Sequence, residues 1–358
     1  MNNAVSDYCL LLRVVAAHLV VIGHAASYFG VLGFTQWPSM PYVQSVAVIV
    51  FFFLSGFTIA WLCDFRKNLS GYTYQHFIID RFCRIFIPLL PVLLVYAVLE
   101  YLFYGTIPHP YPDSYNLDAF VSNALLITPQ PFPSAPFGTN RPLWSIAQEW
   151  WLYVSYGVVA LGISSGKAYV RISLFCLFLF SLCFTITDIL GGGKDLGIVW
   201  FLGVIAWKSI SFKVFDRLSV YWIFLTFLVA LLLLLAPSVW PRDGTYTLLW
   251  NILVSVPLFF SFLIAARFNA SFICGSFKGV IEYMGAYSYT LYLSHYPIME
   301  FFYRAEYFLS APWLGFFISC GLAMLVTYLL ASVFEFRYKI YRNYLWGLLG
   351  KSASNSIR

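Results

Sequence analysis

The chain has 358 residues, of which 61% are apolar, 21% aromatic and only 10% charged, and its formal net charge is +6. Soluble domains carry about 25% charged residues, so this composition excludes an ordinary water-soluble fold. A positive charge would suit nucleic acid, but its placement along the chain is explained by membrane topology, so we expect no nucleic-acid partner. We predict an all-α polytopic membrane protein whose surroundings are the lipid bilayer.

Ten apolar stretches follow one another along the chain, and most are long enough for a helix to cross a bilayer. They are residues 8–29, 42–62, 85–104, 143–162, 170–189, 196–210, 219–236, 247–265, 282–303 and 311–334. The first has no cationic region or small-residue cleavage site, so we expect it to stay as an anchor. We predict one transmembrane domain over residues 1–340, a cytoplasmic tail over 341–358 and no appended soluble domain.

The basic residues indicate the orientation. With the N-terminus in the cytoplasm, sixteen Lys and Arg residues fall inside and four fall outside, and Arg13 lies within the membrane. This asymmetry is a strong positive-inside signal and predicts that both termini are cytoplasmic. It also places the longest loop, about 105–141, on the outer side. In that loop the apolar residues of 117–127 follow helical spacing and predict a short interfacial helix, and we expect the loop to influence acceptor choice.

The first apolar stretch carries Arg13 and His24, which a lipid-facing helix would avoid because a buried charge is costly. They are eleven residues apart, nearly three helical turns, so they share one face about 16 Å apart along the axis. His18 points elsewhere. A histidine packed between helices is the plain structural interpretation of His24 alone. Its alignment with Arg13 favours a site on this face.

Two further segments hold polar residues at or near membrane depth. Arg81 and Arg84 are one helical turn apart before the third stretch, and the planar guanidinium suits phosphate. The alternative interpretation of these two arginines is that they only mark the cytoplasmic side of the membrane. At the outer end of the fourth stretch, Trp144, Ser145 and Glu149 lie close together. A belt tryptophan and a snorkelling glutamate are the structural interpretation, but the clustering favours a site.

The ninth stretch contains His295, and Pro297 follows it. Proline leaves a backbone carbonyl one turn earlier without its helical donor, so neighbouring groups must compensate. With the predicted orientation, the polar residues divide between the two sides. His24, Glu149 and His295 fall toward the outer side, and Arg13, Arg81 and Arg84 fall toward the cytoplasm. This division suits a reaction with a donor inside and an acceptor outside.

Five segments, in this order, resemble motifs of the integral membrane acyltransferase 3 family, which O-acylates cell-surface sugars and some lipids. They are Arg13-x10-His24, VFFFLSGF at 50–57, Arg81-x-x-Arg84-Ile85-x-x-Pro88, PLWSIAQE at 142–149 and SYTLYLSHYP at 288–297. The resemblance covers residues 8 to about 335. The chain departs from the family's usual residues at Leu10, Ile49, Trp150 and Ser294, which leaves the arginine and histidine of the first motif intact.

The resemblance implies a membrane O-acyltransferase in the cytoplasmic membrane of a bacterium. Its donor would be acetyl-CoA or another acyl-CoA, and its acceptor a hydroxyl of a carbohydrate or glycolipid on the outer side. Arg81 and Arg84 would bind the donor phosphates, Arg13 would line the path of the donor, and His24 would be the general base. No metal is expected.

The remaining roles are open at this stage. Glu149 either orients His24 or binds sugar hydroxyls, and His295 either stabilises the oxyanion or braces its helix. Trp144, Ser145 and Tyr292 would contact the substrate. Transfer is either direct or passes through an acyl-histidine intermediate. The chain is either a monomer or part of a homo-oligomer. The competing interpretation is a transporter or flippase for a lipid-linked or small anionic substrate, and the lack of visible internal repeats counts against it.

Overall fold

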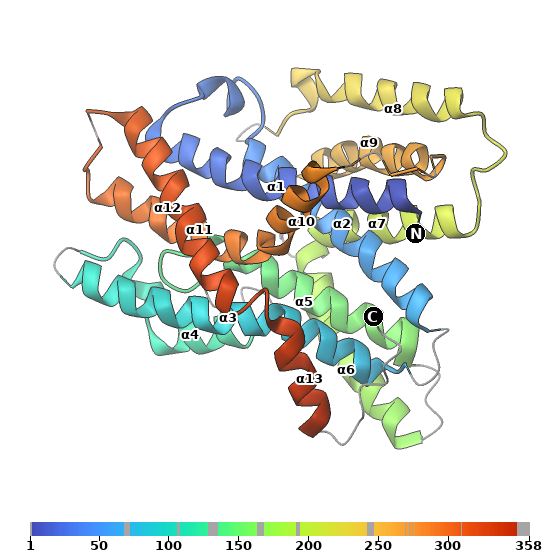
Figure 1. The fold of residues 1–358 in the computed structure, drawn as a ribbon, viewed down its shortest axis with the longest axis horizontal. Coiled ribbons are helices and arrows are strands. Elements are labelled where there is room, and N and C mark those ends of the chain that lie inside the picture. Colours follow the sequence, from blue (N-terminus) through green and yellow to red (C-terminus); the bar gives the residue numbers. More distant parts are fainter. Residues whose placement is uncertain are drawn as a thin grey trace.

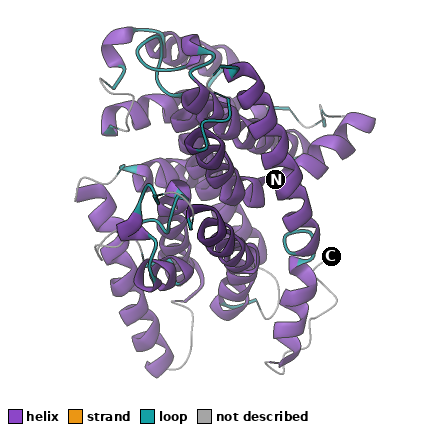
Figure 2. Cartoon of the chain, turned by 90° about the vertical axis from the view of Figure 1, so that its left-hand side faces the viewer, coloured by secondary structure: helices purple, strands orange, loops and turns teal. Residues whose placement is uncertain are grey.

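The computed structural model describes residues 2–67, 72–105, 108–127, 135–162, 168–190, 194–241, 247–268, 270–271, 273, 275–308 and 310–348. The regular structure of these residues is helical, without a strand (Figures 1 and 2). The predicted all-α fold is therefore confirmed. Residues 106–107 and 128–134 of the outer loop and 349–358 of the predicted tail lie outside the described residues.

Five helical stretches among the described residues are long and apolar enough to cross a membrane. They are α1 (Asn3–Phe29), α2 (Val43–Arg66), α3 (Tyr74–Tyr104), α9 (Leu248–Ala266) and Pro312–Gly347, which contains α12 (Pro312–Val333) and most of α13 (Tyr338–Leu348). Other helices are α5 (Trp144–Gly157), continued by a π-helix at Val158–Gly162, α6 (Ala168–Leu190), α7 (Leu196–Ser211) and α8 (Val220–Leu234). Ten spans and the orientation therefore remain predictions.

Two predicted segments have different bounds. The third begins at Tyr74, eleven residues earlier than expected, so Arg81 and Arg84 lie within α3 rather than ahead of it. The ninth was expected to be one helix but is divided at Tyr287 into α10 (Ser276–Ala286) and α11 (Ser288–Arg304). The break is stabilised because the Glu335 carboxylate accepts a hydrogen bond from the Thr290 amide, 2.8 Å away, in the first turn of α11.

α2 and α7 pack closely against each other (Figure 1). Gly56 of α2 and Gly203 of α7 make this approach possible. A Cβ on Gly56 would lie 1.9 Å from the Trp200 carbonyl oxygen, and one on Gly203 would lie 2.1 Å from that of Phe53. Small residues at such contacts are how membrane helices approach closely.

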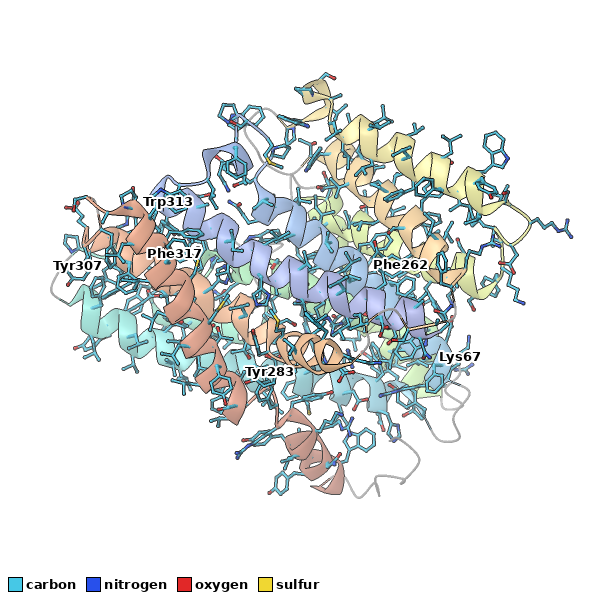
Figure 3. The ribbon with its side chains drawn as sticks, turned by 45° about the horizontal axis from the view of Figure 1, so that its top comes forward. Lys67, Phe262, Tyr283, Tyr307, Trp313 and Phe317 are labelled. Carbon is cyan, nitrogen blue, oxygen red and sulfur yellow. The ribbon has the colours of Figure 1, made fainter. Side chains whose placement is uncertain are left out.

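α5 and α9 also pack against α2, and α6 and α9 pack against α7. α1 packs against α2 on one side and against α11 and α12 on the other, and α8 packs on α9 at the edge of the bundle (Figure 1). Exposed apolar side chains cover the outward faces, as on α12, where Trp313 and Phe317 point away from the bundle (Figure 3). A helix with such a face suits hydrocarbon surroundings. In the loop at about 105–141, α4 (Leu117–Ala124) lies within the stretch expected to be helical.

Candidate functional site

A cavity of about 380 Å³ lies between five helices and is lined by four charged residues. These are Arg13 of α1, Arg81 and Arg84 of α3, and Glu149 of α5. We call it the arginine cavity. Much of the rest of its wall is apolar and comes from α2, where the lining extends from Val48 to Leu62. Fourteen residues of helix correspond to about 21 Å, so the cavity is elongated along the bundle.

The charges of the arginine cavity are only partly compensated by its lining, and the Glu335 carboxylate, outside that lining, also attracts Arg84. In the described part of the chain, no hydrogen bond joins the guanidinium groups of Arg13, Arg81 or Arg84 to another residue, and the buried Nε of Arg81 has no acceptor. Arg84 lies over the Tyr338 ring, with 6.0 Å from Cζ to the ring centroid. Glu149 is the single acidic residue of the lining. Three positive charges against one negative favour an anionic ligand.

Glu149 is held within a chain of polar contacts. It accepts a hydrogen bond from the Tyr153 hydroxyl. That hydroxyl lies 2.8 Å from Ser55 Oγ, which accepts a further bond of 3.1 Å from Trp200 Nε1. The carboxylate also attracts Arg13 and Arg84 electrostatically. Glu149 therefore belongs to the arginine cavity.

His24 and His295 form a second group, which we call the histidine pair. Their ring centroids are 5.3 Å apart, and the Tyr296 ring meets His24 edge-on at 4.9 Å. His295 is fully buried, and its Nδ1 lies 3.0 Å from the Leu291 carbonyl oxygen. Because a carbonyl only accepts, we assign the ring proton to Nδ1. Nε2 is then an acceptor, and it has no partner in the described part of the chain.

Tyr292, which contacts Ser145, links the two groups. Both residues line the arginine cavity, and their hydroxyl oxygens are 2.7 Å apart. The Tyr292 ring centroid is 6.0 Å from that of His295 and 6.1 Å from that of Phe51, another lining residue. Tyr292 therefore borders both the arginine cavity and the histidine pair.

The predicted site residues are thus brought together in two places rather than one. Arg13, Arg81 and Arg84 share the arginine cavity, whereas His24 pairs with His295. Glu149 was expected either to orient His24 or to bind sugar hydroxyls; its carboxylate accepts a hydrogen bond from Tyr153 and lines the arginine cavity.

Trp144 was expected to contact the substrate, and a cation lies over its ring in the structure. The ammonium of Lys194 lies 3.9 Å from the centroid of its ring, so one face of the indole is covered. A sugar has at most the other face available for stacking.

Sequence reasoning missed the polar residues that hold α11 in place. Asn140 Nδ2 donates to the Leu293 carbonyl at 2.7 Å, and the Tyr96 hydroxyl donates to the Ser294 carbonyl at 2.5 Å. The proline at 297 signalled that some donor was needed at Leu293. Nothing in the sequence indicated which residue would supply it.

Comparisons with known proteins identify the family of this chain. Residues 8–332 match the family model of the acyltransferase 3 family, described as an acyltransferase domain. An O-acetyl transferase of Shigella phage Sf6 is 26% identical over 175 residues, which are 45% of this chain and 48% of the phage protein. The match thus spans about half the length of that relative. No solved structure matches this chain. Because the family match covers nearly all of the described helices, the chain belongs to the acyltransferase 3 family.

Proposed function

We propose that the protein transfers a short acyl group, acetyl in the first instance, from acyl-CoA to a hydroxyl of a carbohydrate or glycolipid. Family membership and the similarity to an O-acetyl transferase support O-acyl transfer. The observation that carries the rest is the adjacency of the arginine cavity to the histidine pair through Tyr292, which lines the cavity and whose ring centroid lies 6.0 Å from that of His295. The protein would work in the bacterial cytoplasmic membrane, with its donor inside and its acceptor outside.

The arginine cavity fits the donor in charge and in length. Arg81 and Arg84 would bind its phosphate groups, since guanidinium groups without acceptors are suited to phosphate oxygens. The apolar wall of α2 would receive the pantetheine arm, which needs a long and narrow path. Glu149 would lower the net positive charge beside Arg13 and Arg84.

At the other end, the histidine pair would carry out the transfer. His24 takes the proton of the acceptor hydroxyl as its oxygen forms a bond to the thioester carbonyl carbon. The carbon–sulfur bond then breaks, and His24 returns the proton to the departing sulfur. His295 would keep His24 oriented through its Nε2, which is free to accept. No proton is gained or lost overall.

Donor binding and transfer can be tested with the purified protein in proteoliposomes. Acetyl-CoA at 100 times its Kd should stabilise the folded protein by about 2.7 kcal/mol. Labelled acetyl-CoA supplied on one side should give acetylated glycan or glycolipid on the other. A transporter or flippase would show neither result, and this outcome would exclude the proposed function.

The acceptor can be identified in cells. The mass of surface glycans is compared between a deletion strain and the same strain complemented with the wild-type protein or with His24→Ala. Wild type should restore the mass of the acyl group on one carrier, and the variant should not. The mass difference then names both the acyl group and its carrier.

A further inference from the structure

Pro297 leaves one carbonyl of α11 without its helical donor, directly beside the histidine pair. Proline has no N–H, so the carbonyl four residues earlier, that of Leu293, lacks the bond that a regular helix would supply. Leu293, Ser294 and His295 are all fully buried, so water does not replace the missing donor. Buried backbone carbonyls nearly always have a partner, and this one must find it outside its own helix.

Asn140 supplies that partner. Its Nδ2 donates to the Leu293 carbonyl at 2.7 Å across 153 residues of sequence, and its side chain is itself buried. Asn140 immediately precedes a short 3-10 helix, Arg141–Leu143, which packs on α11. We propose that Asn140 is a positioning residue: its amide stands in for the N–H that Pro297 lacks and thereby fixes His295 against His24. The kinetic consequence rests on the proposed function, whereas the structural consequence does not.

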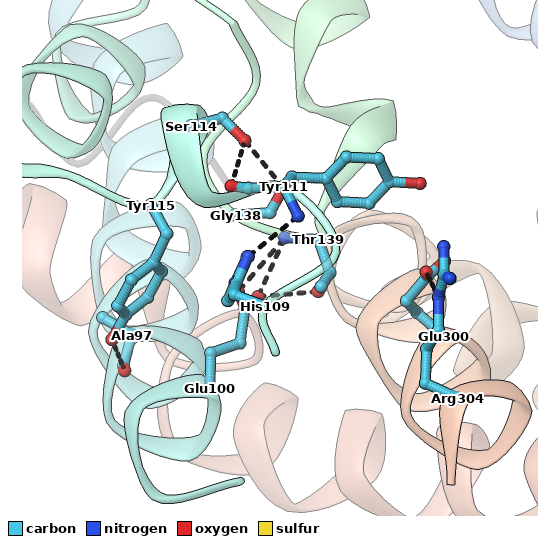
Figure 4. Close-up of polar contacts among 10 residues, drawn as sticks. All are labelled: Ala97, Glu100, His109, Tyr111, Ser114, Tyr115, Gly138, Thr139, Glu300 and Arg304. Carbon is cyan, nitrogen blue, oxygen red and sulfur yellow. Dashed lines mark hydrogen bonds and ion pairs between the residues drawn. The ribbon is translucent and has the colours of Figure 1, made fainter. Parts of the chain in front are cut away.

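The segment that carries Asn140 is fixed to α3 by Glu100 (Figure 4). This buried carboxylate accepts bonds from the Thr139 amide at 3.1 Å, from Thr139 Oγ1 at 2.6 Å and from His109 Nε2 at 2.9 Å. Gly138 has a φ of +54°, and a Cβ there would lie 2.2 Å from Glu100 Oε2. The backbone at 138–139 therefore lies directly on Glu100, and Asn140 is the next residue.

A second residue on the same face of α3 also bonds to the backbone of α11. Tyr96, one helical turn before Glu100, donates its hydroxyl to the Ser294 carbonyl at 2.5 Å. Two successive carbonyls of α11 are thus held from α3, one by Tyr96 directly and the other by Glu100 through Asn140. His295 is the next residue of α11. Its imidazole is tied in turn to the Leu291 carbonyl, so its direction follows the backbone of this turn.

This arrangement predicts a selective kinetic effect. Asn140 does not line the arginine cavity, so losing its amide should leave the KM for acyl-CoA unchanged. A shift of about 1 Å in a catalytic group costs up to about 100-fold in rate, and kcat should fall on that scale. Asn140→Ala removes the amide, and Asn140→Asp keeps the shape but removes the N–H donor. Both should show the loss.

Asn123→Ala is the matched control. Asn123 is a buried asparagine of the outer loop that donates to the Ala119 and Ala135 carbonyls at 2.8 and 3.0 Å, away from α11. Its replacement should lower the stability of the protein, but kcat should stay within about threefold of the wild-type value. If Asn140→Ala and Asn123→Ala reduce kcat equally, Asn140 has no positioning role.

A double variant tests the link to Pro297. Pro297→Ala restores an N–H that can donate to the Leu293 carbonyl and makes the amide of Asn140 redundant. Asn140→Ala should therefore cost about 100-fold when Pro297 is present but only about threefold when it is combined with Pro297→Ala. Equal costs in the two backgrounds would overturn the proposal.

Hydrogen exchange gives a readout that does not require activity. Asn140→Ala should speed amide exchange in peptides covering 289–298, Asn123→Ala should not, and Pro297→Ala should reverse the effect. Unchanged exchange in Asn140→Ala would contradict the proposal even if activity were lost. If Pro297→Ala alone abolishes transfer, activity cannot be compared. Amide exchange of peptides 289–298 in the single and double variants then decides whether Asn140 holds this turn. Failure of the wild-type protein to transfer any acyl group would instead contradict the proposed function.

Discussion

The arginine cavity and the histidine pair both take residues from α1 and α11, but they differ in charge and in packing. The cavity is open, carries three guanidinium groups and compensates them with one carboxylate. The histidine pair is packed among aromatic rings, and His295 is held in one tautomer by a backbone carbonyl.

Under the proposed function, binding and chemistry would be separated along the bundle. An excess of unpaired positive charge is useful for holding an anionic donor, whereas a rigid imidazole is useful for moving a proton. Substitutions in the cavity should therefore change donor affinity, and substitutions in the pair should change turnover. Each prediction below tests one side of this comparison.

The largest effect is expected at His24. His24→Ala should reduce the single-turnover rate about 1,000-fold, the scale of a lost general base, while acetyl-CoA still raises the Tm as in wild type. Because the two histidines would act as a unit, adding His295→Ala should cause little further loss. Rates are measured in proteoliposomes with labelled donor.

The control for His24 is on the same helix. His18 is bonded through Nδ1 to the Val14 carbonyl and faces away from the pair, so His18→Ala should change the rate by no more than about twofold. Near wild-type turnover in His24→Ala would rule out its role as the base. Lost donor binding in that variant would show that the two regions are not separate.

The next largest effect is expected at Arg84. Losing a charge-assisted contact worth about 1.5–3 kcal/mol should raise the Kd for acetyl-CoA by roughly 10- to 100-fold in Arg84→Gln, with kcat little changed. The shift of Tm with donor concentration measures this affinity. Arg171→Gln, an exposed arginine of α6, is the control and should bind normally.

A truncated donor sharpens this prediction. Acetyl-pantetheine lacks the nucleotide phosphates, so its affinity should be the same for wild type and Arg84→Gln. If the variant weakens both donors equally, Arg84 does not contact phosphate and the assigned orientation of the donor is wrong.

A smaller effect is expected where the two regions meet. Tyr292→Phe removes the hydroxyl that contacts Ser145, a bond worth about 1 kcal/mol, and should change kcat/KM about fivefold. Because both residues line the cavity, the variant should also accept a butyryl donor better relative to acetyl. Competition between the two donors measures the preference. Tyr283→Phe, on the exposed side of α10, should leave it unchanged.

The smallest effect is expected at Glu149. Its carboxylate lies with the arginines, so Glu149→Gln leaves more net positive charge in the cavity and should tighten donor binding by about threefold. Turnover should remain within the same factor. A loss of turnover as large as that of His24→Ala, at unchanged donor affinity, would show that Glu149 takes part in the transfer reaction.

The sequence by itself determined the membrane character, the helical class and the alignment of Arg13 with His24. Hydropathy is a property of each segment, and the helical period fixes which residues of one helix share a face. The first, second and eighth apolar stretches accordingly match α1, α2 and α9 closely. The motif order was enough to indicate the family.

Only the tertiary structure decided how the helices are turned against one another. The period of α5 does not say whether Glu149 faces His24 or the arginines, because that depends on the rotation of one helix relative to others. The division between α10 and α11 depends on Glu335, a residue beyond the end of α12. Likewise, Pro297 announced an unpaired carbonyl, but a partner 153 residues away is chosen by packing and has no local signal in the chain.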